Sequence, residues 1–320
     1  MADATPFVSL PEAAAIGIAL ERPQPTVVGA TTFVWGARTF VMGIVNATPD
    51  SFSGDGLMAA AGPDGDQATA EPGSLAEAIA AQGAAMVLEG ADLVDIGGES
   101  TRPGHRPIDA DEERRRVLAG LAALHAARPE LPISVDTRRA EVAEAAIAAG
   151  ASMLNDVAAV TDPSDALLRV AAAHEVPVIL MHDRAEARYR NVVAEVLVDL
   201  QRAIDRAVAA GVAWERCIVD PGIGFGKTAD QNLAILHDLA VLRCLGRPVM
   251  LGMSRKSTIG RVLDLPAEER LEGTLATTAL AIAAGVDIVR VHDVLANVRT
   301  ARMADAIIRV PARETESRLR

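Results

Sequence analysis

The stretch Cys217–Lys227, with the sequence CIVDPGIGFGK, joins an apolar strand pattern to a loop that neither a helix nor a strand can contain. Residues 217–219 are apolar and partly β-branched, which is typical of a short buried strand. Three glycines at every second position follow, so we expect a tight loop with Asp220 at the strand tip. A Walker A loop needs glycine at Pro221 and a dinucleotide fingerprint needs glycine at Lys227, so neither motif fits. Taken alone, the stretch is also compatible with a glycine-rich connection that has no chemistry.

The same short strand pattern recurs along the chain and alternates with segments of helical periodicity. Strands are expected at 41–45, 92–96, 133–136, 152–155, 178–181, 217–220, 249–251 and 287–291. Helices are expected from Ser74 to about residue 88 and at 111–127, 139–149, 163–174, 191–210, 231–241, 270–284 and 293–308. Eight strands that are each followed by a helix require a parallel sheet covered by helices, so the sequence predicts an α/β protein with a (β/α)8 TIM barrel. An open doubly wound sheet is the alternative.

Three segments lie outside this repeat. Residues 1–26 have weak periodicity and are expected to form an N-terminal extension, and residues 311–320 a C-terminal tail. Residues 54–73 are rich in Gly, Ala, Asp and Pro and are too long for an ordinary connection, so we expect a long mobile loop there. No linker or shift in composition divides the rest, and residues 27–310 are therefore expected to form one domain.

A hairpin is expected at residues 27–40, before the first barrel strand. Residues 31–35 and 38–40 have strand composition, and Gly36-Ala37 between them can form a short turn. The sequence therefore predicts a barrel with an N-terminal hairpin and extension.

Composition and charge exclude several classes of protein. The 320 residues are 50% apolar and 23% charged, as in a globular protein with a large core. The net charge of −12 argues against a broad nucleic-acid-binding surface and against binding to an anionic membrane. Two cysteines, Cys217 and Cys244, support neither a disulfide framework nor a cysteine zinc site. No signal peptide and no bilayer-spanning apolar run are recognised, so we expect a cytoplasmic protein.

Polar side chains follow all eight expected strands. Loops at the C-terminal ends of barrel strands carry the function of such proteins, so these residues form the candidate site. Asp136, Asn155 and Asp220 are short polar side chains at strand tips, and we expect them to form a hydrogen-bonding floor for a planar ligand rich in N–H groups and ring nitrogens. Asp136 and Asn155 could alternatively cap the helices that follow them.

Basic side chains cluster after the last two expected strands. Arg290 and His292 are two residues apart on a strand, so their side chains leave on the same side. Arg255 and Lys256 follow the neighbouring strand, and barrels often bind phosphate at this place. A single Arg or His would be an ordinary surface residue, but four such groups in an acidic protein favour an anion site.

The loops after the first two expected strands combine oxygen ligands with a cation. They contain Asn46, Asp50 and Ser51, and then Thr101 and Arg102. This mixture suits a polyphosphate that carries magnesium, because Mg²⁺ is usually held by few protein groups and mainly by substrate oxygens. The same residue pairs are also ordinary turn chemistry, so they do not predict a metal by themselves.

Taken together, these motifs resemble those of the dihydropteroate synthase family, folate-pathway enzymes built on a pterin-binding barrel. The matching segments are 42–53, 95–104, 134–137, 155–156, 180–182, 220–227, 252–257 and 290–294. Two segments depart from the family pattern: 54–73 is longer, and 183–189 differs in composition at the rim of the expected pterin pocket. The resemblance implies that residues 27–310 form a pterin-binding TIM barrel.

The resemblance also implies roles for individual residues. The pterin would be held by Asp136, Asn155, Met181, Asp220, Phe225 and Lys256. The diphosphate would be bound by Asn46, Arg102, Arg290 and His292, and Mg²⁺ by Asn46. The p-aminobenzoate pocket, the site of sulfonamide action in the family, would be framed by Phe52, Pro103, Phe225, Lys256 and Ser257. The groups nearest the reacting atoms would be Asn46, Thr101, Arg102, Lys256, Arg290 and His292.

The activity implied by the resemblance joins a pterin diphosphate to p-aminobenzoate, with magnesium, in a homodimeric enzyme. This activity needs no protein nucleophile, and the sequence offers neither a Ser-His-Asp nor a Cys-His set. Two alternatives share the barrel and the pterin floor. One is a methyltransferase that passes a methyl group from a folate to a corrinoid protein, and the other is a pterin-binding paralogue without catalytic activity.

Overall fold

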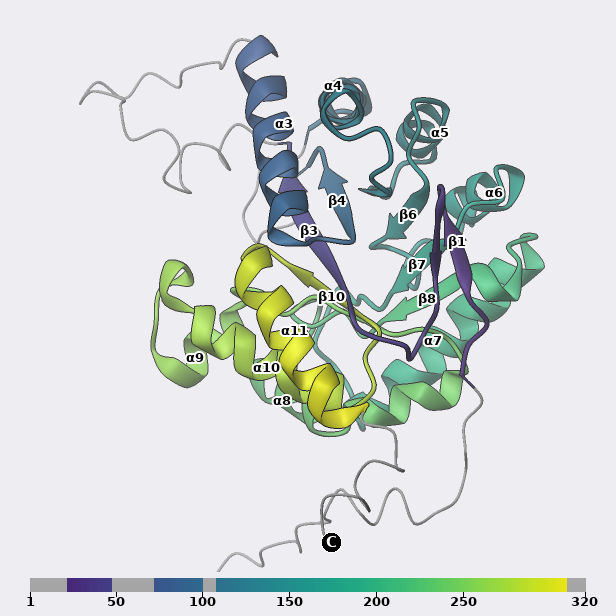
Figure 1. Cartoon of the computed structure of the whole chain (residues 1–320). Helices are drawn as coiled ribbons and strands as arrows, with labels where there is room; N and C mark the ends of the chain where they lie inside the picture. Colours follow the sequence, from purple (N-terminus) through teal and green to yellow (C-terminus); the bar gives the residue numbers. More distant parts are fainter. Residues whose placement is uncertain (1–21, 48–71, 100–107, 310–320) are drawn as a thin grey trace, which may run out of the picture.

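The computed structural model describes residues 22–47, 72–99 and 108–309, which form a ring of parallel strands surrounded by helices (Figure 1). The strands of the ring are β3 (Phe40–Asn46), β4 (Leu93–Gly97), β5 (Ile133–Asp136), β6 (Met153–Asp156), β7 (Val178–Met181), β8 (Cys217–Asp220), β9 (Met250–Leu251) and β10 (Ile288–Val291). They are hydrogen-bonded in the order β8-β7-β6-β5-β4-β3-β10-β9. A parallel bridge between Val219 and Val249 joins the two outermost strands. The predicted (β/α)8 barrel is therefore confirmed, and the doubly wound alternative is wrong.

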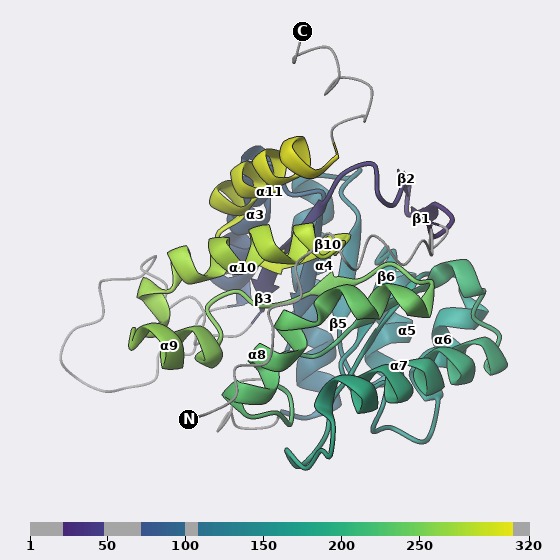
Figure 2. The same cartoon turned by 90° about the horizontal axis from the view of Figure 1, so that it is seen from below.

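Helices cover the outside of this ring (Figures 1 and 2). They are α3 (Pro72–Glu89), α4 (Ala110–Ala127), α5 (Ala140–Ala148), α6 (Ala166–Ala173), α7 (Val192–Ala209), α8 (Ala229–His237), α9 (Ser257–Leu263), α10 (Leu271–Ala283) and α11 (Val294–Ile308). Short 3₁₀ turns occupy Trp214–Arg216, Leu239–Leu245 and Ala267–Glu269. Helix α3 begins before the expected Ser74, and the helix expected over 231–241 is divided between α8 and a 3₁₀ turn. Helix α9 was not predicted, because its seven residues are too few to show a clear apolar period.

The N-terminal hairpin exists, but it pairs other residues than predicted. Strand β1 (Thr26–Val28) pairs with β2 (Thr31–Phe33) around Gly29, which has a φ of 59° that suits glycine. The predicted turn at Gly36-Ala37 instead leads into β3, which begins at Phe40. The reason is packing: the Phe33 ring lies 4.5 Å from the Phe40 ring, centroid to centroid, so these two residues meet in a core instead of pairing in a sheet.

Two apolar cores hold the barrel together. The inner core lies inside the ring of strands and includes Val28, Phe33, Trp35 and Phe40 of the N-terminal segment. From the ring itself it contains Met42, Leu93, Met153, Ile179, Ile218, Met250 and Ile288. The outer core lies between the strands and the helices. The hairpin and the residues after it therefore contribute to the core inside the barrel.

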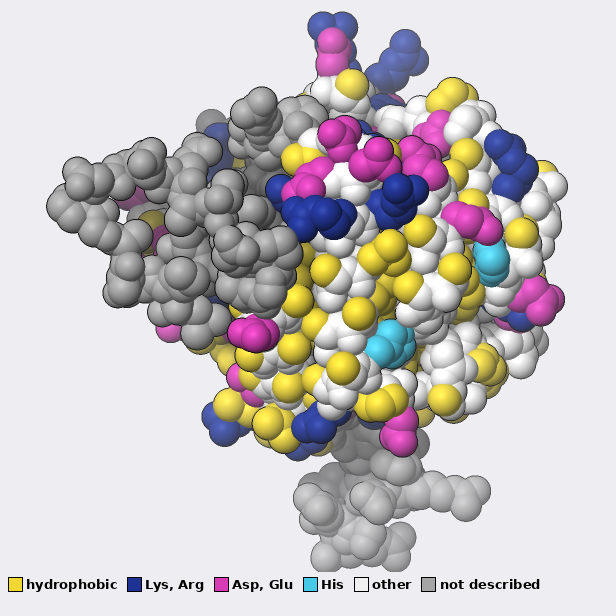
Figure 3. Space-filling view, turned by 90° about the horizontal axis from the view of Figure 1, so that it is seen from above, with side chains coloured by type: hydrophobic (Ala, Val, Ile, Leu, Met, Phe, Trp, Pro, Cys, Tyr) yellow, Lys and Arg dark blue, Asp and Glu magenta, His cyan; other side chains and the backbone are white. Residues whose placement is uncertain are grey.

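The surface carries interspersed charges. Helix α4 has exposed pairs between Asp111 and Arg114 and between Glu112 and Arg115, each 2.8 Å apart. On the face seen in Figure 3, acidic and basic side chains lie side by side with apolar ones between them.

No helix within the described ranges has the length and apolar content needed to cross a membrane. Of the segments predicted to flank or interrupt the barrel, 1–21, 54–71 and 311–320 lie outside the described residues.

Asp156, at the end of β6, supplies a test of stability. Its carboxylate is 4% exposed and accepts a hydrogen bond from the Ala158 backbone N–H at 3.0 Å. Burial raises the pKa of Asp156 from 3.8 to about 7. An acid whose pKa is higher in the folded state is penalised once the pH exceeds its unfolded value, and the full penalty applies above the folded value. We therefore expect Asp156→Asn, which keeps the acceptor oxygen, to raise the free energy of unfolding by about 1–3 kcal/mol at pH 8.

The gain should shrink as the pH falls from 8 towards 4, because the parent carboxyl becomes protonated. Urea denaturation of both proteins at pH 5 and pH 8 measures the difference. An equal gain at both pH values would show that the charge of Asp156 is not its cause.

Candidate active site

The polar layer of the barrel lies directly above the inner apolar core. Side chains alternate along a strand, so a residue two positions after an inward-pointing one also points inward. This spacing relates Leu93 to Asp95, Met153 to Asn155, Ile218 to Asp220 and Ile288 to Arg290. On β5, Ser134 is fully buried and Asp136 follows at the same spacing. The C-terminal mouth of the barrel is therefore lined by carboxylates, an amide and one guanidinium.

Arg290 lies at the centre of this layer. Its Nε donates to Asp95 Oδ2 at 2.6 Å, and its Nη2 donates to Asp136 Oδ2 at 3.0 Å. Asn155 Nδ2 donates to the same Asp95 oxygen at 3.0 Å. The guanidinium therefore balances two carboxylates inside the barrel, where an unpaired charge would be costly.

The expected cluster of four cations is only partly present. Besides Arg290, Arg255 is paired with a carboxylate, since its Nη2 lies 2.7 Å from Asp293 Oδ1. The Nδ1 atom of His292 lies 3.0 Å from Ser254 Oγ. Sequence spacing placed these groups at one end of the barrel correctly, but it could not show that acidic partners already neutralise two of them.

Two buried oxygens in the layer lack a partner. Among the described side chains, Asp95 Oδ1 and Asn155 Oδ1 are buried and accept no hydrogen bond. A buried acceptor without a donor costs free energy, and a ligand that supplied donors to these two oxygens would remove that cost. The floor therefore suits a planar ligand that presents N–H groups to the barrel.

Burial also sets the charge states of the layer. It raises the pKa of Asp136 to about 7, although Arg290 acts in the opposite direction. Burial likewise raises the pKa of Asp220, and it lowers the pKa of Lys256 to about 8. Shifted pKa values of this kind are common at functional sites, because the same burial that shapes a pocket penalises charge.

The glycine loop after β8 supplies one wall of the site. Gly222 N donates to Asp220 Oδ1 at 2.7 Å. A Cβ atom on Gly222 would lie 1.8 Å from the carbonyl oxygen of His182, so only glycine fits there. The Nζ atom of Lys256 donates to the Ile223 carbonyl and lies 4.7 Å from the centre of the Phe225 ring. The loop thus brings Asp220 and Lys256 to one wall of the site.

Asp136 and Asn155 do not cap the helices that follow them. Helix α5 has Arg139 as its N-cap and helix α6 has Asp165. Asp136 instead bonds to Arg290, and Asn155 donates to a carboxylate of the floor.

The remaining predicted residues are placed as follows. Met181 is buried at the end of β7 and Ser257 is exposed at the start of α9. Asn46 ends β3, which lies between β4 and β10. Phe52, Thr101, Arg102 and Pro103 lie outside the described residues, as do Asp50 and Ser51.

Asp95, His182 and Lys227 belong to the site region but received no role from the sequence. Asp95 stands in the middle of β4, so its place in the sequence is that of a strand residue and not of a strand tip. Its spacing of two residues from Leu93 was the available signal. His182 and Lys227 contact each other across 45 residues, which no local pattern reveals.

Comparison with known proteins agrees with this geometry. The family model described as "Pterin binding enzyme" matches residues 42–292. Dihydropteroate synthase from Clostridium beijerinckii is 44% identical over 283 residues, which cover 88% of this chain and 99% of that protein. The chain belongs to the dihydropteroate synthase family.

Solved structures of dihydropteroate synthases are similar in fold and sequence. The Xanthomonas albilineans enzyme with 4-aminobenzoic acid has a TM-score of 0.79 and 41% identity, covering 90% of this chain and 100% of that chain. The same organism's enzyme in complex with 7,8-dihydropteroate has a TM-score of 0.77 and 39% identity, with the same coverage. The similarity thus extends over nearly the whole described barrel.

Proposed function

We propose that this protein is a dihydropteroate synthase that condenses 6-hydroxymethyl-7,8-dihydropterin diphosphate with p-aminobenzoate to give 7,8-dihydropteroate and diphosphate. Membership of the family supports this activity. The observation that carries it at the site is the pair of buried acceptors without donors, Asp95 Oδ1 and Asn155 Oδ1, beside Asp136 and Asp220. The amino and ring N–H groups of a pterin match such acceptors.

The residues of the site would act by positioning and by electrostatics. The bond between the pterin methylene carbon and the diphosphate oxygen breaks, and its electron pair leaves with the diphosphate. The aniline nitrogen of p-aminobenzoate forms the new bond to that carbon and then loses a proton. Asp136, Asn155 and Asp220 hold the ring, while Lys256 faces the Phe225 side of the pocket. Orientation of two substrates and stabilisation of the departing charge can supply most of such a rate enhancement.

We place the diphosphate at the ends of β3 and β10. Asn46 and His292 come from these adjacent strands, and Arg102 would approach from the loop after β4. Arg290 stays a proposed diphosphate contact, and its pairing with Asp95 and Asp136 gives it a second task, the stabilisation of the pterin floor.

Turnover separates this proposal from the alternatives. Purified protein with the pterin diphosphate, Mg²⁺ and p-aminobenzoate should form dihydropteroate, which chromatography detects. Calorimetric binding of the pterin without any product would favour a non-catalytic paralogue. Binding of a methyl-folate without need of diphosphate would favour a methyltransferase.

Magnesium fits the site as an ion carried by the substrate. The described residues hold no group of three or more His, Cys, Asp or Glu side chains suited to a metal. Asn46 offers an amide oxygen, and Mg²⁺ is commonly held by one or two protein groups together with substrate phosphates. When bound, the ion would offset charge on the leaving diphosphate.

Removal of magnesium should therefore suppress turnover. We expect EDTA to lower kcat/KM at least about tenfold and added Mg²⁺ to restore it. Asn46→Ala should raise the Mg²⁺ concentration needed for half-maximal rate. Full activity in EDTA would contradict the assignment of Asn46 and the ion.

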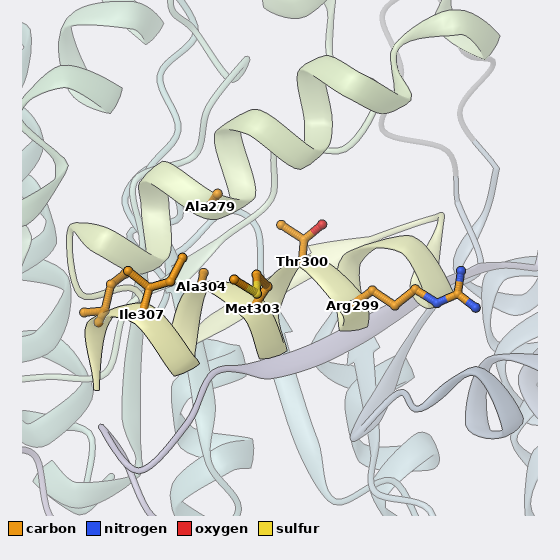
Figure 4. A pocket seen from close by; sticks show the side chains of 7 residues that line it. Ala279, Arg299, Thr300, Met303, Ala304 and Ile307 are labelled. Atoms are coloured by element: carbon orange, nitrogen blue, oxygen red, sulfur yellow. The ribbon is translucent and has the colours of Figure 1, made fainter. Parts of the chain in front are cut away.

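We also propose that the protein is a homodimer joined through α10 and α11. A groove of about 450 Å³ lies between these helices, lined by Ala279, Arg299, Thr300, Met303, Ala304, Ile307 and Ile308 (Figure 4). Met303 and Ile307 are 62% and 65% exposed, and Leu280 on the same pair of helices is 71% exposed. Apolar side chains gathered on one face favour association with a second copy.

Ile307→Asp is expected to convert the dimer to a monomer, because it buries a carboxylate at the interface. Sedimentation velocity measures the change. Val27→Asp is the matched control, since Val27 is a 60% exposed apolar residue on the hairpin. A dimer that survives Ile307→Asp would rule out this face.

We further propose a cytoplasmic location, in keeping with the free thiols of Cys217 and Cys244.

A further inference from the structure

The chain uses lysine in two places only. Lysine and arginine together number 31, and all but Lys227 and Lys256 are arginine. Both lysines border the glycine loop that follows Asp220. An ammonium group gathers three donors on a single atom, whereas a guanidinium spreads five over a plane, so the two are not interchangeable where acceptors converge on one point.

Acceptors do converge on Lys227. Its Nζ atom lies 2.9 Å from the carbonyl oxygens of Gly222 and Phe225. It also lies 2.9 Å from His182 Nδ1 and 3.3 Å from the His182 carbonyl oxygen. The Lys227 Nζ atom therefore hydrogen-bonds to both ends of the glycine loop and to His182, the residue that follows β7.

His182 completes this arrangement as a neutral ring. It is fully buried, and its Nε2 lies 3.3 Å from Asp199 Oδ2 on helix α7. Burial, followed by the nearby charge of Lys227, lowers the pKa of His182 to about 4. Because the Asp199 carboxylate can only accept, the ring proton must be on Nε2, where it points to Asp199, and Nδ1 accepts from Lys227.

The loop held by Lys227 contacts two residues assigned to pterin binding, Asp220 and Lys256. Gly222, whose carbonyl is held by Lys227, donates its N–H to Asp220 Oδ1. Phe225, whose carbonyl is also held, places its ring 4.7 Å from Lys256 Nζ. Glycines at 222 and 226 let the loop lie against the backbone of 182–184, since a Cβ atom at either would clash with a carbonyl there.

We propose that Lys227, together with neutral His182, is a positioning residue for the pterin: it fixes the loop 222–226 so that Asp220 and Phe225 meet the ring. Lys227 itself does not touch the substrate. This inference rests on the proposed function, because it assigns the held loop to pterin binding.

Calorimetry with the pterin diphosphate, in the absence of p-aminobenzoate, tests the proposal. We expect Lys227→Met and Lys227→Arg each to raise the pterin Kd at least tenfold, since neither side chain can donate from one atom to all the converging acceptors. Arg128→Met is the control, because it removes an exposed basic side chain at the C-terminal end of α4, away from the mouth of the barrel, and it should leave Kd unchanged. A lower Tm with a pterin Kd within twofold of the parent would overturn the proposal, because Lys227 would then serve the fold alone.

A measurement on the parent protein keeps the test valid if the variants fail to fold. Protein labelled with ¹⁵N-histidine should show His182 as the Nε2–H tautomer between pH 6 and pH 8. Protein labelled with ¹⁵N-lysine has two side-chain Nζ signals, and the Lys227 signal should be protected from exchange with water before any ligand is added. A His182 ring protonated on Nδ1 would overturn the arrangement. Formation of dihydropteroate by the parent protein is measured separately, so failure of the proposed function and failure of this inference are distinguishable.

Discussion

Arg290→Met is expected to abolish measurable dihydropteroate formation and to destabilise the fold together. The substitution fills a similar volume but removes the cation between Asp95, which is fully buried, and Asp136. Leaving a buried carboxylate without its partner costs about 3–5 kcal/mol. The pterin floor would also lose its fixed geometry, and we expect kcat/KM to fall by about 10³-fold or more. Urea denaturation and steady-state kinetics measure the two effects.

Two controls separate the causes. Arg216→Met removes an arginine from a partly exposed pair with Glu175, 3.6 Å apart, and should cost less than about 1 kcal/mol. The double variant Arg290→Met with Asp95→Asn removes one of the two carboxylates left without a partner, so it should regain part of the lost stability while remaining inactive. If the double variant were as unstable as Arg290→Met, the pairing with Asp95 would not be the source of the stability.

Lys256→Met is expected to lower kcat/KM by about 10²-fold or more and to weaken the binding of both substrates. The ammonium donates to the Ile223 carbonyl and lies over the Phe225 ring, and its positive charge favours the ionised form of Asp220. Its loss would affect the pterin wall and the side of the pocket assigned to p-aminobenzoate. Separate calorimetric titrations with each substrate measure the two contributions, and a normal affinity for both would show that the site is assigned wrongly.

The titration of Lys256 should make kcat/KM depend on pH. Burial lowers the pKa of the Lys256 ammonium to about 8, so the charge is present below that pH and is lost above it. The value of kcat/KM should therefore fall as the pH rises through about 8. Lys256→Arg keeps a charge at all accessible pH values, and its residual activity should lack this decrease. A decrease that persists in Lys256→Arg would assign the titration to another group.

Much of the fold could be predicted because its signals are local. The apolar strand Cys217–Val219 and the glycine loop after it are confirmed as β8 and its C-terminal turn. The repeated alternation of short strands with helices fixed the barrel class, since parallel strands need helices to connect them. Asp136, Asn155 and Asp220 were expected at strand ends, and all three lie at the mouth of the barrel.

The errors concern positions where distant packing decides the structure. Local composition favoured a hairpin turn at Gly36-Ala37, but the packing of Phe33 and Phe40 in the inner core placed the turn at Gly29 instead. Helix α9 was missed because seven residues give too short a period.

The sequence by itself determined which residues form strands, which loops follow them and which end of the barrel carries the chemistry, because side-chain periodicity and glycine requirements act over a few neighbouring residues. Only the tertiary structure decided which side chains pair with one another there. Arg290 meets Asp95 across 195 residues of sequence, and Lys227 meets His182 across 45. Such partners are set by closure of the sheet, which brings the tips of all strands to one mouth regardless of their separation along the chain.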